Sequence, residues 1–256
     1  MKSLFAFVKK EMLEQIRSYK LLITLVIFSL VGIMNPAIAK LTPWFYDMFS
    51  DVLAESGMII SDVTVSAMDS WMQFFKNLPI VLIAFVLLQG TILTREFRSG
   101  TLILSLTKGF ARFKVVVSKA SVLTVIWSTA YWFCFGITYF CNSYLWDSGV
   151  AQNIAFSALC WWLFGVFVVS LVIFFSILFA SYPGVLIGTG ATLLFLYMIG
   201  LIPQVGRYLP TLLMDGNSLI YSLSDVNEYI ASVIVTVILT IISLIVTIPV
   251  FNKKQL

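Results

Sequence analysis

The sequence contains no histidine and only three cysteines in 256 residues, namely Cys134, Cys141 and Cys160. No two of these cysteines have Cys-x-x-Cys spacing, and all three fall in or near apolar runs. Zinc and many transition metals are held in proteins by histidine nitrogen and cysteine sulfur. The sequence therefore predicts no metal site of this kind, and we interpret the cysteines as small side chains that are compatible with lipid.

Charge is also scarce in this sequence. Asp, Glu, Lys and Arg make up 11% of the residues, 60% are hydrophobic, and the mean hydropathy is +1.01. A soluble domain is about a quarter charged. The composition predicts an all-α integral membrane protein in which residues 1–256 form a single transmembrane domain. The start, MKSLFAFVKKEMLEQIRSYK, mixes charged with apolar residues and lacks a small-residue cleavage site, so we expect no cleaved signal peptide.

Six apolar runs are long enough to cross a bilayer, whose apolar core of about 30 Å needs about 20 helical residues. We therefore predict transmembrane helices at residues 21–39, 77–93, 115–140, 154–180, 184–202 and 228–251. Only Ser181-Tyr182-Pro183-Gly184 separates the fourth run from the fifth. Because Pro and Gly interrupt helices, we interpret this stretch as a tight hairpin.

The charged residues predict the orientation. With the N-terminus in the cytoplasm, 13 of the 16 basic residues fall on the inner side, and only Lys40, Lys76 and Arg207 fall outside. An excess of Lys and Arg is typical of the cytoplasmic side, so both termini are predicted to be cytoplasmic. Almost every charge lies at the end of a run, from which we expect no buried ion pair or proton relay.

Residues 1–20 show an amphipathic pattern from residue 3 onward. Four apolar residues are expected to face lipid, and four charged residues are expected to face water and headgroups: Leu4, Phe7, Val8 and Met12, and Lys9, Lys10, Glu14 and Arg17, respectively. The pattern predicts an N-terminal interfacial helix. The alternative is an ordinary basic flank that only sets the topology.

Two segments on the expected outer side are unusual. Residues 40–76 form an acidic loop whose aromatic residues are expected to anchor it at headgroup level: Trp44, Phe45, Tyr46 and Trp71. Residues 203–226 are too apolar for a solvated loop and too broken by Pro and Gly to span the membrane. A re-entrant or interfacial pair of short helices fits this segment best, since irregular backbone at membrane depth must be sheltered by protein. A loop lying on the surface is the alternative.

Several functional motifs are absent. No Gly-x-x-x-x-Gly-Lys-Ser/Thr stretch exists, so we expect this chain not to bind ATP phosphates itself. The mid-span Ser–His or carboxylate pair of an intramembrane protease is also missing, and we expect no enzyme activity and no catalytic residue. The basic residues lie beside the membrane, where anionic lipid is a simpler partner than nucleic acid.

Residues 94–108 link the second and third runs and can form one amphipathic helix. Gly100 lowers helix propensity by about 1 kcal/mol relative to Ala, so it can mark a bend. A loop that only sets topology is the simpler interpretation. Glu96 argues against it, because this acid lies among basic residues on the side where acids are rare.

The same linking segment resembles the signature of the ABC-2-type permeases. In that family an acidic residue precedes Ser/Gly-Thr-Leu, a Leu-Thr-x-Pro turn follows, and an Arg precedes Ser-Lys at the start of the third span. The matching stretches are Glu96-Phe97-Arg98-Ser99-Gly100-Thr101-Leu102, Leu106-Thr107-Lys108-Gly109, and Arg112 with Ser118-Lys119. Lys108-Gly109 departs from the usual Pro. The resemblance also covers the whole layout of interfacial helix, six spans and broken segment before the last span.

The resemblance implies that residues 94–108 are a coupling helix that docks into a separate cytoplasmic ABC ATPase dimer. ATP and Mg²⁺ would be bound by that partner and not by this chain, which would pair with a second permease copy as a homodimer or heterodimer. The implied ATPase contacts are Glu96, Phe97, Arg98, Ser99, Gly100 and Thr101, with a smaller contact at Tyr182 and Pro183. The resemblance also implies a multi-pass protein of a bacterial cell membrane.

We therefore predict the permease subunit of an ABC exporter. Its spans carry aromatic and small residues but no fixed mid-span charge, which suits a lipid, an antibiotic or a hydrophobic peptide, with self-immunity as one concrete role. The alternative is a membrane scaffold or signalling protein that recruits a cytoplasmic partner through its basic segment 94–119.

Overall fold

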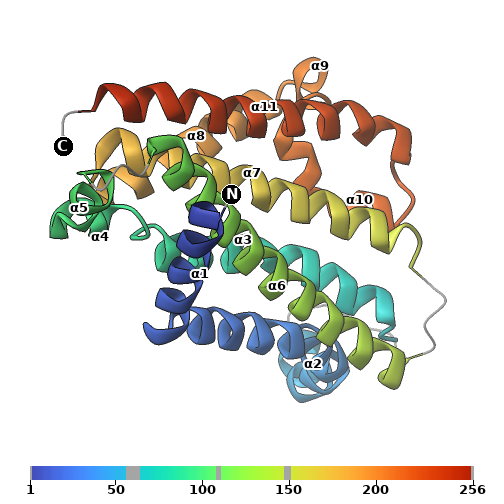
Figure 1. The fold of residues 1–256 in the computed structure, drawn as a ribbon. Helices are drawn as coiled ribbons and strands as arrows, with labels where there is room; N and C mark the ends of the chain where they lie inside the picture. The colour runs from blue at the N-terminus through green and yellow to red at the C-terminus, as the bar shows by residue number, and fades with distance from the viewer. Residues whose placement is uncertain (1, 56–63, 108–110, 147–150, 255–256) are drawn as a thin grey trace.

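The computed structural model describes residues 2–55, 64–107, 111–146 and 151–254, and within these ranges every regular element is a helix (Figure 1). In chain order the elements are α1 (Lys2–Arg17), α2 (Lys20–Glu55), α3 (Ala67–Gln89), α4 (Thr94–Ser99), α5 (Thr101–Thr107), α6 (Arg112–Leu145), α7 (Ile154–Phe179), α8 (Tyr182–Gly200), α9 (Pro203–Gly206), the 3₁₀ helix η1 (Pro210–Met214), α10 (Gly216–Ile220) and α11 (Val226–Lys253).

Six of these helices are long and apolar enough to cross a membrane, and they correspond one by one to the six predicted spans. The chain is thus a multi-pass membrane protein of the all-α class, as predicted. The helices extend beyond several predicted bounds. The third runs from Arg112 to Leu145, and the second starts at Ala67, ten residues before the predicted start at 77. Polar residues at the ends of a span can remain helical outside the apolar run.

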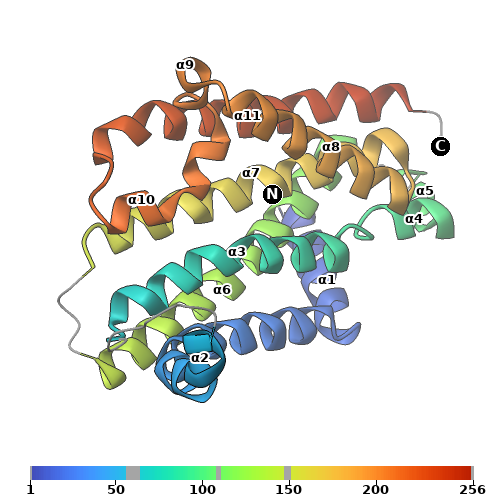
Figure 2. The same cartoon turned by 180° about the vertical axis from the view of Figure 1, so that it is seen from behind.

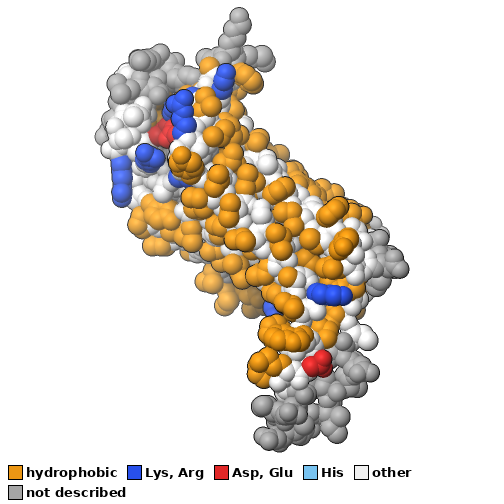
Figure 3. Space-filling view, turned by 90° about the horizontal axis from the view of Figure 1, so that it is seen from below, with side chains coloured by type: hydrophobic (Ala, Val, Ile, Leu, Met, Phe, Trp, Pro, Cys, Tyr) orange, Lys and Arg blue, Asp and Glu red, His pale blue; other side chains and the backbone are white. Residues whose placement is uncertain are grey.

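The long helices lie side by side in one bundle, with α2, α3 and α6 on one side and α7, α8 and α11 on the other (Figures 1 and 2). α1, α4, α5 and the C-terminal end of α11 gather at one end, which we name the charged end, while α10 lies toward the opposite end. Side chains on the surface follow the same division. Figure 3 shows basic groups concentrated at one end and an apolar surface over the middle of the bundle.

α2 continues through much of the region that was predicted to be an outer loop. Its helix reaches Glu55 and contains Pro36 and Pro43, and Figures 1 and 2 show its last part turned sharply away from its first. Proline removes a backbone hydrogen bond and clashes with the preceding turn, which accounts for a bend here. The loop prediction for residues 40–76 is therefore wrong for the described parts that belong to α2 and α3.

The aromatic residues of that region divide between surface and interior. Trp44, Phe45 and Tyr46 are exposed on α2, as expected of residues that contact lipid headgroups. Trp71 is buried at 2% exposure and packs against Phe74 in α3, so its prediction as a surface anchor is wrong. The helix containing Trp71 begins earlier than its apolar run suggests because Ser66 and Asp69 form a reciprocal capping box.

The interior of the bundle is an aromatic core centred on Trp127 of α6. Its ring packs edge-on against Phe28 and Phe85, with centroids 5.8 and 5.3 Å away, and its indole nitrogen donates to the Trp162 carbonyl at 3.1 Å. Gly165 of α7 lies directly under this ring, because a Cβ built there would come 2.0 Å from a ring carbon. A small residue is thus what allows α6 and α7 to approach at this point.

The segment before the last span folds into three short helical pieces, α9, η1 and α10. Leu213, Leu219 and Ile220 are buried, and the pieces pack against α7, α8, α11 and α3. Trp161 donates to the Met214 carbonyl at 2.7 Å and Ser232 donates to the Leu209 carbonyl at 2.5 Å. Neighbouring helices therefore bind the backbone at both ends of η1, whereas none of the residues of α9 is buried.

Candidate functional site

The predicted coupling segment is two short helices rather than one. α4 ends where Gly100 adopts a left-handed conformation, with φ of 68°, and α5 begins at the next residue. Glycine adopts this conformation without the steric cost that a Cβ imposes, so the sequence permits a sharp break here. The bend that Gly100 suggested is present, and it turns the expected single helix 94–108 into a pair. The expected turn at Lys108-Gly109 lies outside the described residues.

A cluster of buried charges joins α4 to the rest of the charged end. Lys119 of α6 is 1% exposed, and its ammonium group lies 2.5 Å from a Glu11 carboxylate oxygen and 3.0 Å from a Glu96 oxygen. It also donates to the Ile92 carbonyl at 3.1 Å. Lys10 of α1 reaches the second oxygens of the same two carboxylates, at 3.1 and 3.0 Å. Two ammonium groups thus share two carboxylates. We name these four residues, Lys10, Glu11, Glu96 and Lys119, the Lys119 cluster.

The cluster is polarised between interior and surface. Glu11 and Lys119 are buried, whereas the Lys10 side chain is half exposed and also approaches Glu14 at 3.7 Å. Burial would by itself lower the pKa of Lys10, but the Glu11 and Glu96 carboxylates outweigh burial and raise this pKa above its usual value. Lys10 consequently stays protonated at physiological pH, and its charge holds α1 against α4.

The expectation that the chain has no buried ion pair is therefore wrong. A lysine inside an apolar run is costly unless an acidic group pairs with it. Lys119 lies within the predicted third span of residues 115–140, and this position was a signal in the sequence that such a partner exists. The partner could not be identified in advance, since Glu11 is 108 residues away along the chain.

Three carboxylates, Glu11, Glu14 and Glu96, bring their oxygens within 4.8 Å of one another, a spacing that could hold a metal ion. The two ammonium groups of the Lys119 cluster already lie among these oxygens at ion-pair distances. They supply the positive charge that a divalent ion would otherwise provide, so the donor set is that of an ion-pair cluster.

Glu96 and Phe97 point into the protein. Glu96 is 6% exposed within the Lys119 cluster, and the ring of Phe97 packs edge-on against Phe251 of α11 at 6.2 Å between centroids. The Lys254 ammonium group lies 5.0 Å from the centre of the same ring. These two residues therefore attach α4 to α1, α6 and α11, and their predicted contact with an ATPase stays a prediction.

Arg98, Ser99 and Thr101 lie on the exposed side of the α4–α5 break. The Ser99 and Thr101 side chains are exposed, and their hydroxyl groups lie 2.9 Å apart across the partly exposed Gly100. The structure thus separates the predicted contact residues into an inward pair and an outward group. Only the outward group has the exposure that docking to another protein requires.

The second predicted contact lies at the start of α8. Pro183 is exposed, while the Tyr182 hydroxyl donates to the Leu87 carbonyl of α3 at 3.0 Å, and the Tyr182 ring lies over Gly90. Gly90 ends α3 shortly before α4 begins. The structure therefore brings both predicted contact segments to the same corner of the charged end.

Two basic residues, Arg112 at the start of α6 and Lys254 directly after α11, tie the C-terminal end of α11 to α6 and α7. The Arg112 guanidinium, at the start of α6, donates to the carbonyls of Phe251, Asn252 and Lys254. The Lys254 ammonium group in turn donates to the last carbonyls of α7, at Ile177 and Leu178. Cations at helix C-termini satisfy carbonyls that lack helical partners. The hydrogen bonds of Arg112 and Lys254 therefore hold the ends of α6, α7 and α11 together.

The apolar face of α1 also differs from its prediction. Phe7, Val8 and Met12 pack against the core and not against lipid, while Phe5, Leu13 and Ile16 are the exposed apolar residues. The predicted helix exists but is rotated about its axis relative to the prediction, because burying Glu11 beside Lys119 turns the opposite face outward.

The chain matches no family model, no curated protein and no solved structure.

Proposed function

We propose that the chain is the membrane subunit of an ABC exporter of the ABC-2 type, with ATP hydrolysed by a separate cytoplasmic ATPase dimer. The charged end would then face the cytoplasm, and the exposed side of the α4–α5 break would dock on the ATPase. The observation that carries the proposal is the construction of this segment. The exposed break at Gly100 follows α4, and buried contacts of Glu96 and Phe97 attach α4 to α6 and α11. A segment that transmits movement of an ATPase to the spans needs such contacts.

The contacts of α4 would transmit a movement of the ATPase to α1, α6 and α11. Glu96 is bound to α1 through Lys10 and to α6 through Lys119, and Phe97 packs against the end of α11. A displacement of α4 by nucleotide-driven closure of the ATPase would be transmitted to these three helices, because buried ion pairs and an aromatic contact bind α4 to them and loss of a buried pair is costly. In this proposal Glu96 positions the segment, and Arg98, Ser99 and Thr101 contact the partner.

The surface of the bundle supports a second copy and an apolar cargo. α8 and α11 are the least covered of the six spans, with 17% and 11% of their most apolar windows buried. Their exposed residues are large and apolar, including Phe195, Met198 and Ile241. Such faces can pair with another permease or line a path for a lipid, an antibiotic or a hydrophobic peptide. α8 carries no charged residue, and α11 carries none between Glu228 and Lys253 near its two ends.

The test is affinity purification of the tagged chain from its native membrane in mild detergent, with mass spectrometry of the proteins that accompany it. We expect a soluble ABC ATPase in about equal amount. Arg98→Glu should reduce its recovery at least about tenfold, since like-charge or mismatched contacts at an interface cost several kcal/mol. The matched control is Arg207→Glu, which makes the same charge change at an exposed site after α9.

Two results would contradict the proposal in different ways. If no ATPase accompanies the wild-type chain even after cross-linking, the chain is not an ABC permease, and a partner of another class would favour the scaffold alternative. If the ATPase binds but Arg98→Glu and Arg207→Glu recover it equally, the assignment of the α4–α5 break as the docking site is wrong. Expression and elution volume of both variants must match the wild type for either conclusion.

A further inference from the structure

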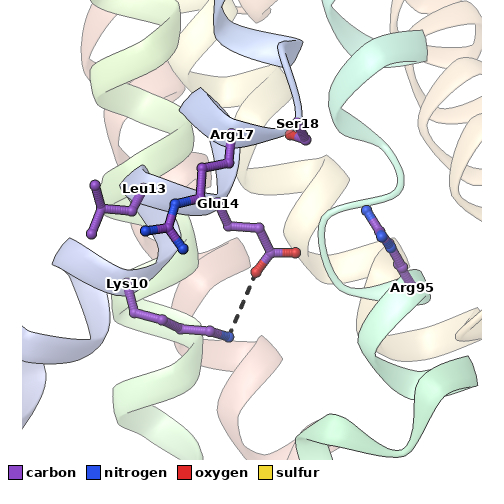
Figure 4. Close-up of a pocket in the computed structure, with 6 residues that line it drawn as sticks. All are labelled: Lys10, Leu13, Glu14, Arg17, Ser18 and Arg95. Carbon is purple, nitrogen blue, oxygen red and sulfur yellow. Dashed lines mark ion pairs between the residues drawn. The ribbon is translucent and has the colours of Figure 1, made fainter.

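A crevice of about 490 Å³ opens at the charged end between α1 and the start of α4 (Figure 4). It is lined by Lys10, Leu13, Glu14, Arg17, Ser18 and Arg95. A smaller recess continues beneath it toward the junction of α1, α2 and α3, where Lys20 donates to the Thr91 hydroxyl at 2.5 Å. The crevice therefore lies between the interfacial helix and the predicted coupling segment.

The crevice and the Lys119 cluster beside it carry an excess of positive charge. Five cations lie in this corner against three carboxylates, which leaves two positive charges uncompensated: Lys10, Arg17, Lys20, Arg95 and Lys119 against Glu11, Glu14 and Glu96. The carboxylates are already bound by Lys10 and Lys119. Within the described residues neither Arg17 nor Arg95 forms an ion pair.

Arg17 and Arg95 come from different elements and stand on either side of Glu14 in the crevice (Figure 4). Guanidinium groups bind phosphate oxygens through paired, charge-assisted hydrogen bonds. Arg17 and Arg95 both line this crevice, and the corner behind them has net positive charge, which favours an anionic group such as a phosphate.

Exposed apolar side chains lie close along the chain to the residues that line the crevice. Leu13 lines it, and Ile16 of α1 with Leu22 and Ile23 of α2 are exposed close by in the sequence. A free phosphate has no use for these side chains, whereas the acyl chains of a lipid cover them. Basic pockets among membrane helices bind anionic headgroups on the same principle.

We propose that this crevice binds the headgroup phosphate of one anionic phospholipid, held by Arg17 and Arg95 with its acyl chains along the exposed apolar face of α1 and α2. The bound lipid joins α1 to α4 through its phosphate, in parallel with the Lys119 cluster. The site does not require the chain to be a transporter. Its ligand is thus a lipid of the surrounding membrane and not the exported cargo.

The experiment uses the full chain in mixed micelles with native mass spectrometry, and the probes are phosphatidic acid, phosphatidylglycerol and phosphatidylcholine. We expect the wild type to retain the two anionic lipids over phosphatidylcholine. Arg17→Gln with Arg95→Gln should reduce retention of phosphatidic acid at least about tenfold. The matched control, Lys9→Gln with Lys253→Gln, removes the same charge from two exposed positions at the charged end outside the crevice and should retain the lipid as the wild type does.

A third variant and a competitor make the test decisive. Glu14→Gln removes the carboxylate between the two guanidinium groups and should strengthen retention. Equal loss of lipid in the crevice and control variants would mean diffuse surface attraction and would overturn the site. Full displacement of the lipid by millimolar glycerol phosphate or inorganic phosphate would show that the crevice takes soluble phosphate, which would overturn the lipid assignment. Elution volume and melting temperature in detergent confirm that each variant is folded.

Discussion

Lys119 and Trp127 lie about two helical turns apart on α6, and both are almost completely buried. Lys119 is held by two carboxylates and a carbonyl from other parts of the chain. Trp127 is held by the shapes of aromatic rings and by a glycine on which its ring lies. Although the two side chains are equally buried, the stability of the fold depends on each of them for a different reason. At Lys119 stability depends on having the right partner charges, and at Trp127 on having the right volume.

The largest effect is expected at Lys119. Lys119→Met leaves Glu11 and most of Glu96 buried with one cation fewer, and removal of one member of a buried ion pair costs about 3–5 kcal/mol. The free energy of unfolding in mixed detergent micelles measures this loss. Lys9→Met, at an exposed position on α1, should change it by less than about 0.5 kcal/mol.

The same experiment can distinguish charge from volume. Lys119→Met combined with Glu11→Gln again balances the cluster, so the double variant should be more stable than Lys119→Met alone. A double variant that is no more stable than Lys119→Met would show that the unbalanced charge of Glu11 is not the cause of the loss, and the contrast with Trp127 would disappear.

A smaller effect is expected in the aromatic core. Gly165→Ala places a methyl group 2.0 Å from a Trp127 ring carbon, so the ring must move, and such overpacking costs about 1–3 kcal/mol. Gly136→Ala is the matched control on α6, because a Cβ there meets nothing within 4 Å. The same micelle titration compares the two. Equal stability of both variants would mean that α6 and α7 can separate at no cost.

The smallest effect is expected at Lys10, on the exposed side of the cluster. Its side chain is 50% exposed, and solvent screens its pairs with Glu11 and Glu96. Lys10→Met should therefore cost about 1 kcal/mol or less, as is usual for surface ion pairs. A loss as large as that of Lys119→Met would show that the cluster behaves as one buried unit with no difference between its inner and outer members.

The sequence predicts the six long helices well because a run of about 20 apolar residues has few other structures available in a bilayer. It does not predict which face of a helix meets protein and which meets lipid. α7 and α11 have nearly equal mean hydropathy, 2.7 and 2.8, yet 61% of the α7 window is buried against 11% for α11. Lipid and protein interior are both apolar, so hydropathy cannot separate them.

The same ambiguity explains the errors in the candidate site. The amphipathic pattern of α1 places Leu4, Phe7 and Val8 together, but an apolar face suits lipid and protein equally well. The inward turn of Glu96 depends on Lys119 and Lys10, which are distant in the chain. The break at Gly100 could be predicted from the sequence, since it follows from the backbone freedom of a single residue.

The Lys119 cluster also orders events while the chain is being made. Glu11 emerges from the ribosome 108 residues before Lys119. The spans α2 and α3 and the α4–α5 pair are therefore synthesised before α1 can pair with this lysine. Glu96, by contrast, precedes Lys119 by only 23 residues, so it has already been synthesised when the lysine is added. Lys119 can therefore pair with a nearby acid as soon as it is synthesised, whereas the charged end is complete only after α11 has been made and Phe251 has packed against Phe97.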